Sequence, residues 1–212
     1  MNSAAEGPPV EQPESFAFTP ENLERATAHI AKYPPGRQQS AVLPLLDLAQ
    51  RQSGGWLPQA AMHTVAEMLG MARIRVYEVA TFYTMFNLRP VGRYFLQACT
   101  TTPCWLRGSD AVVAACEQKL GIGIGDTTED GIFTLVEVEC LGACVNAPIL
   151  QINDDFYEDL DGPATEKLLD QLREGKAPPR GSAIGRRGSA PINGKTTLIE
   201  MPGGAGEDGN AR

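Results

Sequence analysis

Long hydrophobic runs are absent from the 212-residue sequence, and none approaches the roughly 20 residues that a helix needs to cross a bilayer. The N-terminus also lacks the basic start of a secretory signal and the arginine-rich, acid-poor composition of a transit peptide, because five glutamates precede its first basic residue, Arg25. We therefore expect a soluble protein in a reducing cytosol, without direct membrane insertion.

Positive charge is scarce: 18 lysines and arginines stand against 26 aspartates and glutamates, which gives a formal net charge of −8. An acidic chain is a poor candidate for binding nucleic acid, which requires a basic face. Residues 176–212 reverse the balance, with six basic and three acidic residues and a net charge of +3. A basic tail on an acidic body indicates an arm for interaction with another protein.

Several catalytic motifs are missing as well. The sequence has no Walker A loop, no H-E-x-x-H zinc site and no C-x-x-C dithiol. The glycines of residues 121–125 lack the spacing of a dinucleotide-binding turn, and His29 and His63 are isolated on predicted helices. We therefore expect no complete active site in this chain alone.

The first part of the sequence predicts a small helical bundle at residues 19–85, preceded by a flexible arm at residues 1–18. Four helices are predicted, over residues 20–33, 38–52, 58–69 and 74–82. The second and third carry apolar stripes, at Val42, Leu45, Leu46 and Ala49 and at Met62, Val65, Ala66 and Leu69. Pro44 lies inside the second helix, so we expect that helix to kink or to start later.

The following residues alternate strand and helix. Strands are predicted at residues 94–99 and 132–139, a hairpin at 149–157 around Asn153-Asp154-Asp155, and helices at 109–120 and 163–173. This order indicates a compact α/β sandwich, which we place at residues 86–175. Glycine and proline make up 12 of residues 176–212, so we expect this tail to be extended and ordered only against a partner.

Four of the five cysteines stand in two close pairs, C-x4-C at Cys99 and Cys104 and C-x3-C at Cys140 and Cys144. Each pair follows a predicted strand, so four thiolates converge on one metal centre if these strands are parallel neighbours in a sheet. Two pairs match a [2Fe–2S] cluster, which four cysteine thiolates commonly hold. The spacing also fits a structural zinc, and a thiol–disulfide site stays open.

The neighbours of the cysteines offer small side chains, hydroxyls and backbone N–H donors. They are Thr100, Thr101, Thr102, Gly142 and Asn146. Hydrogen bonds to sulfur are one determinant of a cluster's reduction potential, and Arg107 would add positive charge nearby. Cys116 lies on a predicted helix among apolar residues, and we interpret it as a buried small hydrophobe.

Longer motifs around the cysteines resemble a known family. The segments C-T-T-T-P-C at residues 99–104 and E-V-E-C-L-G-A-C-V-N-A-P at residues 137–148 are similar to the thioredoxin-like [2Fe–2S] ferredoxins, and among them to the small iron–sulfur subunits of NADH:quinone oxidoreductases. The segments A-T-F-Y at residues 80–83 and R-P-V-G at residues 89–92 are similar to the same subunits. The resemblance covers residues 19–178.

This resemblance implies a thioredoxin-like [2Fe–2S] domain after the helical bundle. It implies one [2Fe–2S] cluster with four ligands, Cys99, Cys104, Cys140 and Cys144. A one-electron centre cannot accept the hydride of NADH, so a flavin must divide the electron pair. The resemblance assigns that FMN, and the NADH site, to a partner flavoprotein subunit.

The assembly implied is respiratory complex I, with this chain as an electron-transfer subunit beside further iron–sulfur subunits. We would then expect the chain at the cytoplasmic face of a bacterial inner membrane, held there through the complex. The equivalent subunit of an NAD-linked hydrogenase or formate dehydrogenase shares the cysteine pattern and stays an alternative. A zinc-stabilised binding module without redox function is a third interpretation.

Overall fold

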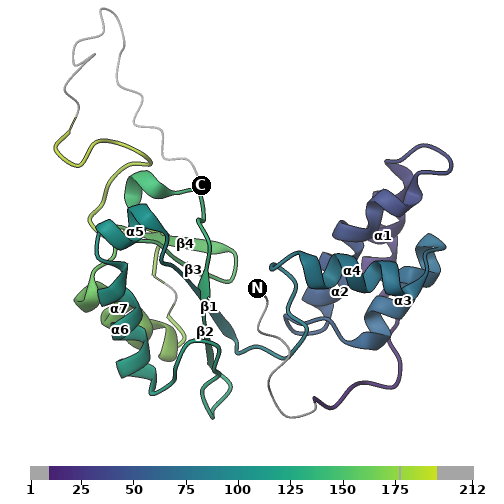
Figure 1. The fold of residues 1–212 in the computed structure, drawn as a ribbon, viewed down its shortest axis with the longest axis horizontal. Coiled ribbons are helices and arrows are strands. Elements are labelled where there is room, and N and C mark those ends of the chain that lie inside the picture. Colours follow the sequence, from purple (N-terminus) through teal and green to yellow (C-terminus); the bar gives the residue numbers. More distant parts are fainter. Residues whose placement is uncertain (1–9, 177, 195–212) are drawn as a thin grey trace, which may run out of the picture. The chain divides into compact units, whose positions relative to one another are not determined.

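The structure, a computed structural model, describes residues 10–176 and 178–194 and divides into two compact units. The first unit contains the described residues up to Phe95 together with Gly125–Thr134, and the second contains Leu96–Ile124 and the described residues from Leu135 onward. All five cysteines belong to the second unit (Figure 1). Within the described ranges, every helix falls short of the length and hydrophobicity that a membrane span requires.

The first unit is a bundle of short helices. They are α1 (Pro20–Ala31), the 3-10 turn η1 (Gln38–Ala41), α2 (Val42–Gln52), α3 (Gln59–Leu69) and α4 (Arg73–Phe82). Thr19 caps α1, because its side chain accepts a hydrogen bond from the backbone N–H of Asn22. The helix predicted over residues 38–52 starts with η1, so Pro44 falls in the first turn of α2, where its missing N–H costs no helical hydrogen bond.

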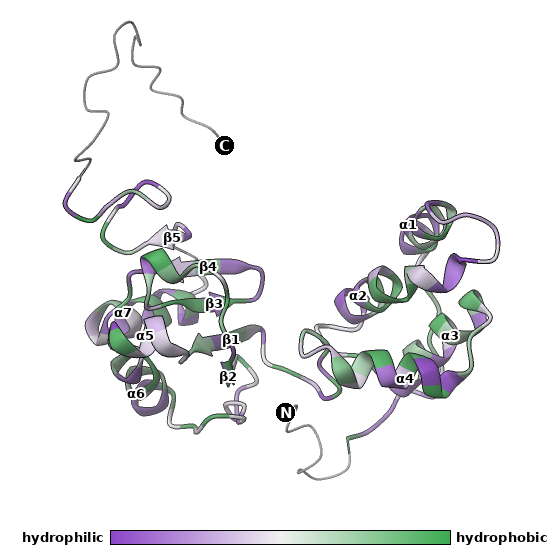
Figure 2. Cartoon of the chain, turned by 45° about the horizontal axis from the view of Figure 1, so that its top comes forward, coloured by the Kyte–Doolittle hydropathy of each residue, from purple (hydrophilic) through white to green (hydrophobic). Residues whose placement is uncertain are grey.

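Both apolar stripes predicted for this bundle are buried, which confirms them. The buried members are Val42, Leu45, Leu46 and Ala49 on α2 and Met62, Val65, Ala66 and Leu69 on α3. They share one hydrophobic core with Phe86, which follows α4. Figure 2 shows that each helix of this unit carries both hydrophobic and hydrophilic stretches, the pattern of helices that bury one face.

Residues 10–18 require a correction to the expected flexible arm. The carbonyl of Phe16 accepts a hydrogen bond from the Thr64 hydroxyl at 2.9 Å, and that of Ala17 accepts one from the Gln52 side chain at 2.8 Å. The rings of Phe16 and Phe18 meet edge to face at 5.1 Å and pack against the helical core. Two aromatic anchors therefore hold this segment on the bundle, whereas residues 1–9 of the predicted arm lie outside the described residues.

A five-stranded sheet has the order β2-β1-β3-β4-β5, and all of it belongs to the second unit except the first two residues of β1 and of β2. The strands are β1 (Tyr94–Cys99), β2 (Phe133–Val138), β3 (Leu150–Ile152), β4 (Asp155–Glu158) and β5 (Gly181–Ser182). Strand β3 runs antiparallel to both β1 and β4, and β5 runs parallel to β4. The two strands that precede the cysteine pairs are thus neighbours in the sheet, β2 beside β1, which is one of the two conditions of the cysteine argument.

Gly92 allows the chain to enter β1 close to β2. Its N–H donates to the Thr134 hydroxyl at 2.6 Å. A Cβ atom at this position would lie 2.7 Å from the carbonyl carbon of Phe133, closer than any real contact of that kind. Only glycine fits this approach, which aligns the starts of the two strands.

Helices pack beside the sheet. They are α5 (Thr102–Leu106), α6 (Ser109–Leu120), α7 (Gly162–Arg173) and the 3-10 turn η2 (Cys144–Asn146), and α6 and α7 lie side by side (Figure 1). The predicted hairpin is confirmed: β3 and β4 are joined at Asn153, whose φ of 54° is left-handed. The predicted fold class, a helical bundle followed by a mixed α/β domain, is confirmed as well.

The start of the tail also differs from its expectation. Gly181 and Ser182 form β5 against β4, and the N–H of Ala183 donates to the carbonyl of Glu158 at 2.8 Å. Residues 181–190 therefore fold against their own chain, so the expectation of order only against a partner is corrected for this part. The tail from residue 195 lies outside the described residues.

Candidate metal centre

The first cysteine pair is held by regular structure. Cys99 is the last residue of β1, and Cys104 lies in α5, a short helix that the sequence analysis did not predict. Pro103 stands in the first turn of that helix, where proline is favoured. Both thiols are buried, with 2% and 1% of the residue exposed.

The second pair lies at the surface. Cys140 follows β2 and is exposed, and Cys144 opens η2 and is half-buried. Their sulfur atoms are 3.3 Å apart. A tetrahedral metal with bonds near 2.3 Å holds two sulfurs about 3.8 Å apart. This pair therefore needs only a small adjustment to chelate one metal ion.

Contacts between the two loops bring the pairs together. The backbone N–H of Leu141, next to Cys140, donates to the sulfur of Cys99. The Thr101 hydroxyl lies 3.3 Å from the Cys99 sulfur and also hydrogen-bonds Cys140, so it contacts one cysteine of each pair. Leu141 and Ala143, which lie between the cysteines of the second pair, pack against the buried first pair. All four thiols thus gather where β1 and β2 end.

The pKa values in the first pair diverge. Burial opposes ionisation of Cys99, but hydrogen bonds from the Thr101 hydroxyl and from the N–H groups of Leu141 and Thr101 outweigh it, so the pKa of Cys99 lies below its usual value. Burial and the hydrogen bond to Cys99 raise the pKa of Cys104 to about 12. The two thiols of this pair therefore differ in how readily they ionise, and Cys99 is the more acidic one.

The second pair repeats this division. The Gly142 N–H and then the Cys144 thiol lower the pKa of Cys140, while the hydrogen bond to Cys140 raises the pKa of Cys144. Each pair thus combines one thiol whose pKa is lowered with one whose pKa is raised, and a metal held by thiolate ligands would have to displace the proton of the second thiol.

The donor set fits a [2Fe–2S] cluster. Its two irons are commonly held by four thiolates, and the structure supplies two pairs on neighbouring loops with N–H donors aimed at the sulfurs. Within the described residues, no group of three or more Cys, His, Asp or Glu side chains is arranged around a single ion. The geometry is that of two pairs.

Some of the other residues named from the sequence act as predicted. Thr101 and Gly142 donate to the thiols, whereas Thr100 hydrogen-bonds Glu137 and Asn146 hydrogen-bonds Glu158. Cys116 is fully buried on α6, and burial raises the pKa of its thiol to about 12, which confirms its interpretation as a small hydrophobe.

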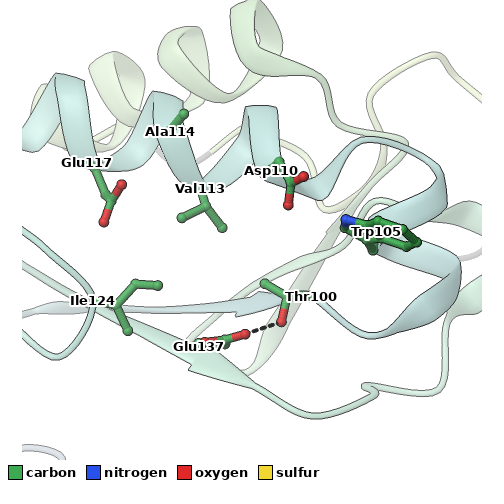
Figure 3. Close-up of a pocket in the computed structure, with 8 residues that line it drawn as sticks. All are labelled: Thr100, Trp105, Asp110, Val113, Ala114, Glu117, Ile124 and Glu137. Carbon is green, nitrogen blue, oxygen red and sulfur yellow. Dashed lines mark hydrogen bonds between the residues drawn. The ribbon is translucent and has the colours of Figure 1, made fainter.

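A pocket of about 420 Å³ lies beside the first pair (Figure 3). Thr100 and Trp105, the residues after Cys99 and Cys104, line it together with carboxylates from α6 and β2. Figure 3 shows the hydrogen bond from the Thr100 hydroxyl to Glu137 at its floor. Trp105 is 57% exposed, so the surface next to these thiols is partly apolar.

Sequence reasoning missed the contacts behind the second pair. The guanidinium of Arg186 donates to the carbonyl of Val145, the residue after Cys144, and pairs with Asp159. The only signal for it in the sequence was that Arg186 is one of the few cations in a tail rich in glycine and proline.

Comparisons with known proteins agree with this geometry. Residues 26–173 match the sequence model of the thioredoxin-like [2Fe–2S] ferredoxins. The chain is 62% identical over 159 residues to the E subunit of the NADH-quinone oxidoreductase of Rickettsia conorii, covering 75% of this chain and 95% of that protein. It is 54% identical over 189 residues to the mitochondrial NADH dehydrogenase [ubiquinone] flavoprotein 2 of Dictyostelium discoideum, covering 89% and 76%.

A solved structure shares the fold. The crystal structure of an air-oxidised NAD+-reducing [NiFe]-hydrogenase superposes with a TM-score of 0.54 at 21% sequence identity. The match covers 61% of this chain and 23% of the hydrogenase chain. The match of the family's sequence model to most of the chain, together with the close relatives, decides the family. The chain belongs to the thioredoxin-like [2Fe–2S] ferredoxin family.

Proposed function

We propose that the chain is the [2Fe–2S] electron-transfer subunit of an NADH:quinone oxidoreductase. Cys99 and Cys104 would hold one iron of the cluster, and Cys140 and Cys144 would hold the other. The observation that carries the proposal is the convergence of two thiol pairs from neighbouring strands. The identity of 62% to Rickettsia proteins named as the E subunits of NADH-quinone oxidoreductases supports the choice of complex.

The residues of the chain have separate tasks in this function. When bound, the cluster supplies a site for one electron at a time. The N–H groups of Leu141 and Gly142 and the hydroxyl of Thr101 donate toward the sulfurs, and so favour the more negative, reduced state. The buried first pair excludes water from one side of the centre, and the exposed second pair leaves the other side open to a partner.

The partner is a flavoprotein subunit. NADH delivers two electrons as a hydride, which a one-electron centre cannot accept, so a flavin has to divide them. We place FMN and the NADH site on that partner, beside further iron–sulfur subunits, and the assembly at the cytoplasmic face of the inner membrane. The helical bundle at residues 19–85 and the domain at residues 86–175 dock as parts of this complex.

The tail is the other partner-binding element of the proposal. Its described residues expose Ile184 and Ile192 by 55% and 54%, so apolar surface is available to a neighbour. Ile184→Ser combined with Ile192→Ser leaves β5 and Arg186 in place. We expect this double variant to weaken binding to the flavoprotein without removing the cluster, and unchanged binding would refute the role of this apolar surface.

Affinity purification from the native organism tests the assignment. A tagged chain should retain a flavin-containing NADH-oxidising subunit and membrane subunits that reduce quinone. Recovery of a hydrogenase or a formate dehydrogenase in their place would assign the chain to an NAD-linked enzyme of that kind. A Cys99→Ser variant serves as the control for whether assembly needs the cluster.

A further inference from the structure

The C-terminal segment Gly181–Ala190, which we call the strap, runs from β5 to the back of the second cysteine pair. Near its start, the Ser182 hydroxyl donates to the Asp159 carboxylate at 2.6 Å. The same hydroxyl accepts a hydrogen bond from the backbone N–H of Arg186 at 3.1 Å. The Arg186 side chain also donates to the Ala190 carbonyl at 3.1 Å. These bonds join Arg186 to Ser182 at the start of the strap and to Ala190 at its end, and the Arg186 guanidinium points toward Asp159.

Asp159 receives that guanidinium. The Arg186 Nε donates to it at 2.9 Å, and a second N–H of the same fork donates to its other oxygen. The side chains of Asp159 and Arg186 are 2% and 11% exposed, so this ion pair is nearly buried. Asp159 itself adopts a left-handed φ of 53° and donates its N–H to the carbonyl of Asn146 at 2.7 Å.

The strap contacts both residues that follow Cys144. The Arg186 Nη2 donates to the carbonyl of Val145 at 2.8 Å. The Asn146 amide donates to the carbonyl of Gly188 at 2.9 Å and to Glu158 at 2.5 Å. The loop that carries Cys144 is therefore fixed by its backbone to a segment about 40 residues later in the chain.

Apart from the strap and the residues around Asp159, this loop is packed on one side only. Leu141 and Ala143 pack against the first pair, whereas Val145 is 65% exposed and Cys140 is exposed. We propose that Arg186 is a positioning residue for the second cysteine pair, which holds the Cys144 loop in the conformation that binds the cluster. This inference rests on the proposed cluster ligands, and it assigns the strap a role inside the chain.

Two variants of the cluster-loaded protein test it. Arg186→Gln removes the guanidinium that donates to Asp159 and to the Val145 carbonyl. We expect iron release to a chelator to become about tenfold faster or more, an effect of the size seen when the residues that orient a metal ligand are replaced. The EPR signal of the reduced protein should shift or broaden. Arg186→Lys keeps the charge but cannot reach Asp159 and Val145 together, so it should rescue only part of the loss.

The matched control is Arg180→Gln. Arg180 lies just before the strap and pairs with Asp155 at 3.0 Å, but both side chains are exposed, by 76% and 46%. We expect this variant to release iron at the wild-type rate with an unchanged EPR signal. An Arg180→Gln effect equal to that of Arg186→Gln would overturn the proposal, because the two sites would then be equivalent.

A double variant separates positioning from the cost of an unpaired buried charge. Asp159→Asn with Arg186→Gln leaves no buried charge, but the Val145 carbonyl still loses its donor. Fast iron release from this variant supports the proposal, and release at the wild-type rate contradicts it. If the wild-type protein holds no [2Fe–2S] cluster, the proposed function fails; if the wild type holds it and Arg186→Gln behaves identically, only this inference fails.

Discussion

The two cysteine pairs are positioned by different means. The first pair is buried and held by a strand end and a helical turn that adjoin it in sequence. The second pair lies on a loop at the surface. Glu158 of β4 holds this loop through the Asn146 side chain, and the strap holds it through Arg186 and Gly188. One half of the centre thus depends on local structure, and the other depends on tertiary contacts.

In the proposed function, this difference gives the two pairs separate roles. The buried pair would anchor the cluster in the domain, and the exposed pair would leave it accessible from one side. A loop that is exposed for function cannot be stabilised by a hydrophobic core, so polar contacts from distant segments replace the core. The following predictions test whether the two pairs are supported in these different ways.

The largest effect should be common to both pairs. Replacing one cysteine of either pair by serine, at Cys104 or at Cys144, removes a thiolate from one iron, so both variants should lose the cluster and its EPR signal. Cys116→Ser is the control, because that thiol lies in α6 outside the four. A Cys144→Ser protein that keeps two irons and an unchanged signal would remove the second pair from the ligand set.

The next largest effect should come from the ion pair between Arg186 and Asp159, which supports the second cysteine pair. Asp159→Asn leaves the Arg186 guanidinium without its carboxylate, and we expect the free energy of unfolding at pH 7 to fall several times further than it does on loss of an exposed pair. Urea denaturation measures it. Asp155→Asn, which removes an exposed pair with Arg180, should cost less than about 0.5 kcal/mol.

The ion pair between Arg186 and Asp159 also predicts that the free energy of unfolding depends on pH. Burial raises the pKa of Asp159, but hydrogen bonds from Arg186 and Ser182 outweigh it and lower the pKa below its usual value. A lowered carboxyl pKa stabilises the fold above the unfolded value of about 3.9, and the stabilisation is lost as the pH falls through the folded value. The difference between wild type and Asp159→Asn should be constant above about pH 5 and shrink in acid; a difference that grows in acid contradicts this.

The close approach of β1 and β2 at Gly92 offers a further test, because these two strands precede the two cysteine pairs. Gly92→Ala places a methyl group against the backbone of Phe133, so the starts of β1 and β2 must separate. We expect a loss of about 1–3 kcal/mol in the free energy of unfolding. Gly162→Ala is the control, since its Cβ would meet only the carbonyl of Ala111 at an ordinary 3.6 Å. Equal stabilities of the two variants would argue against the close approach.

The smallest effect concerns the hydroxyl between the pairs. Thr101→Val removes a donor that contacts Cys99 and Cys140, and the reduced state should lose about 1 kcal/mol, or roughly 40 mV in a one-electron reduction potential. Thr100→Val is matched to it in sequence, but its hydroxyl bonds Glu137 instead of a thiol. A redox titration should give a reduction potential below that of the wild type for Thr101→Val and an unchanged potential for Thr100→Val.

Periodic and local features of the fold could be predicted from the sequence. Apolar spacing gave the stripes of α2 and α3, and the turn at Asn153 gave the hairpin. The cysteines followed strands, so their gathering at one end of the sheet followed from strand order. The α5 turn was missed, although Thr102-Pro103 is a common helix start.

Contacts between distant segments could not be predicted. Residues 10–18 and the strap have no hydrophobic period, so nothing in their sequences identified Phe16 as a core anchor or Arg186 as the partner of Asp159. Their order comes from a few tertiary contacts, and composition alone indicated flexibility. The second cysteine pair was therefore located by the sequence, but its support was not.

The most direct test of the central claim is the metal content of the anaerobically purified chain, measured with its EPR spectrum after reduction. The account predicts two irons and two acid-labile sulfides per chain, with an S = 1/2 signal in the reduced protein. One zinc, no sulfide and no signal would contradict it, and the two cysteine pairs would then serve as a structural zinc site in a binding module.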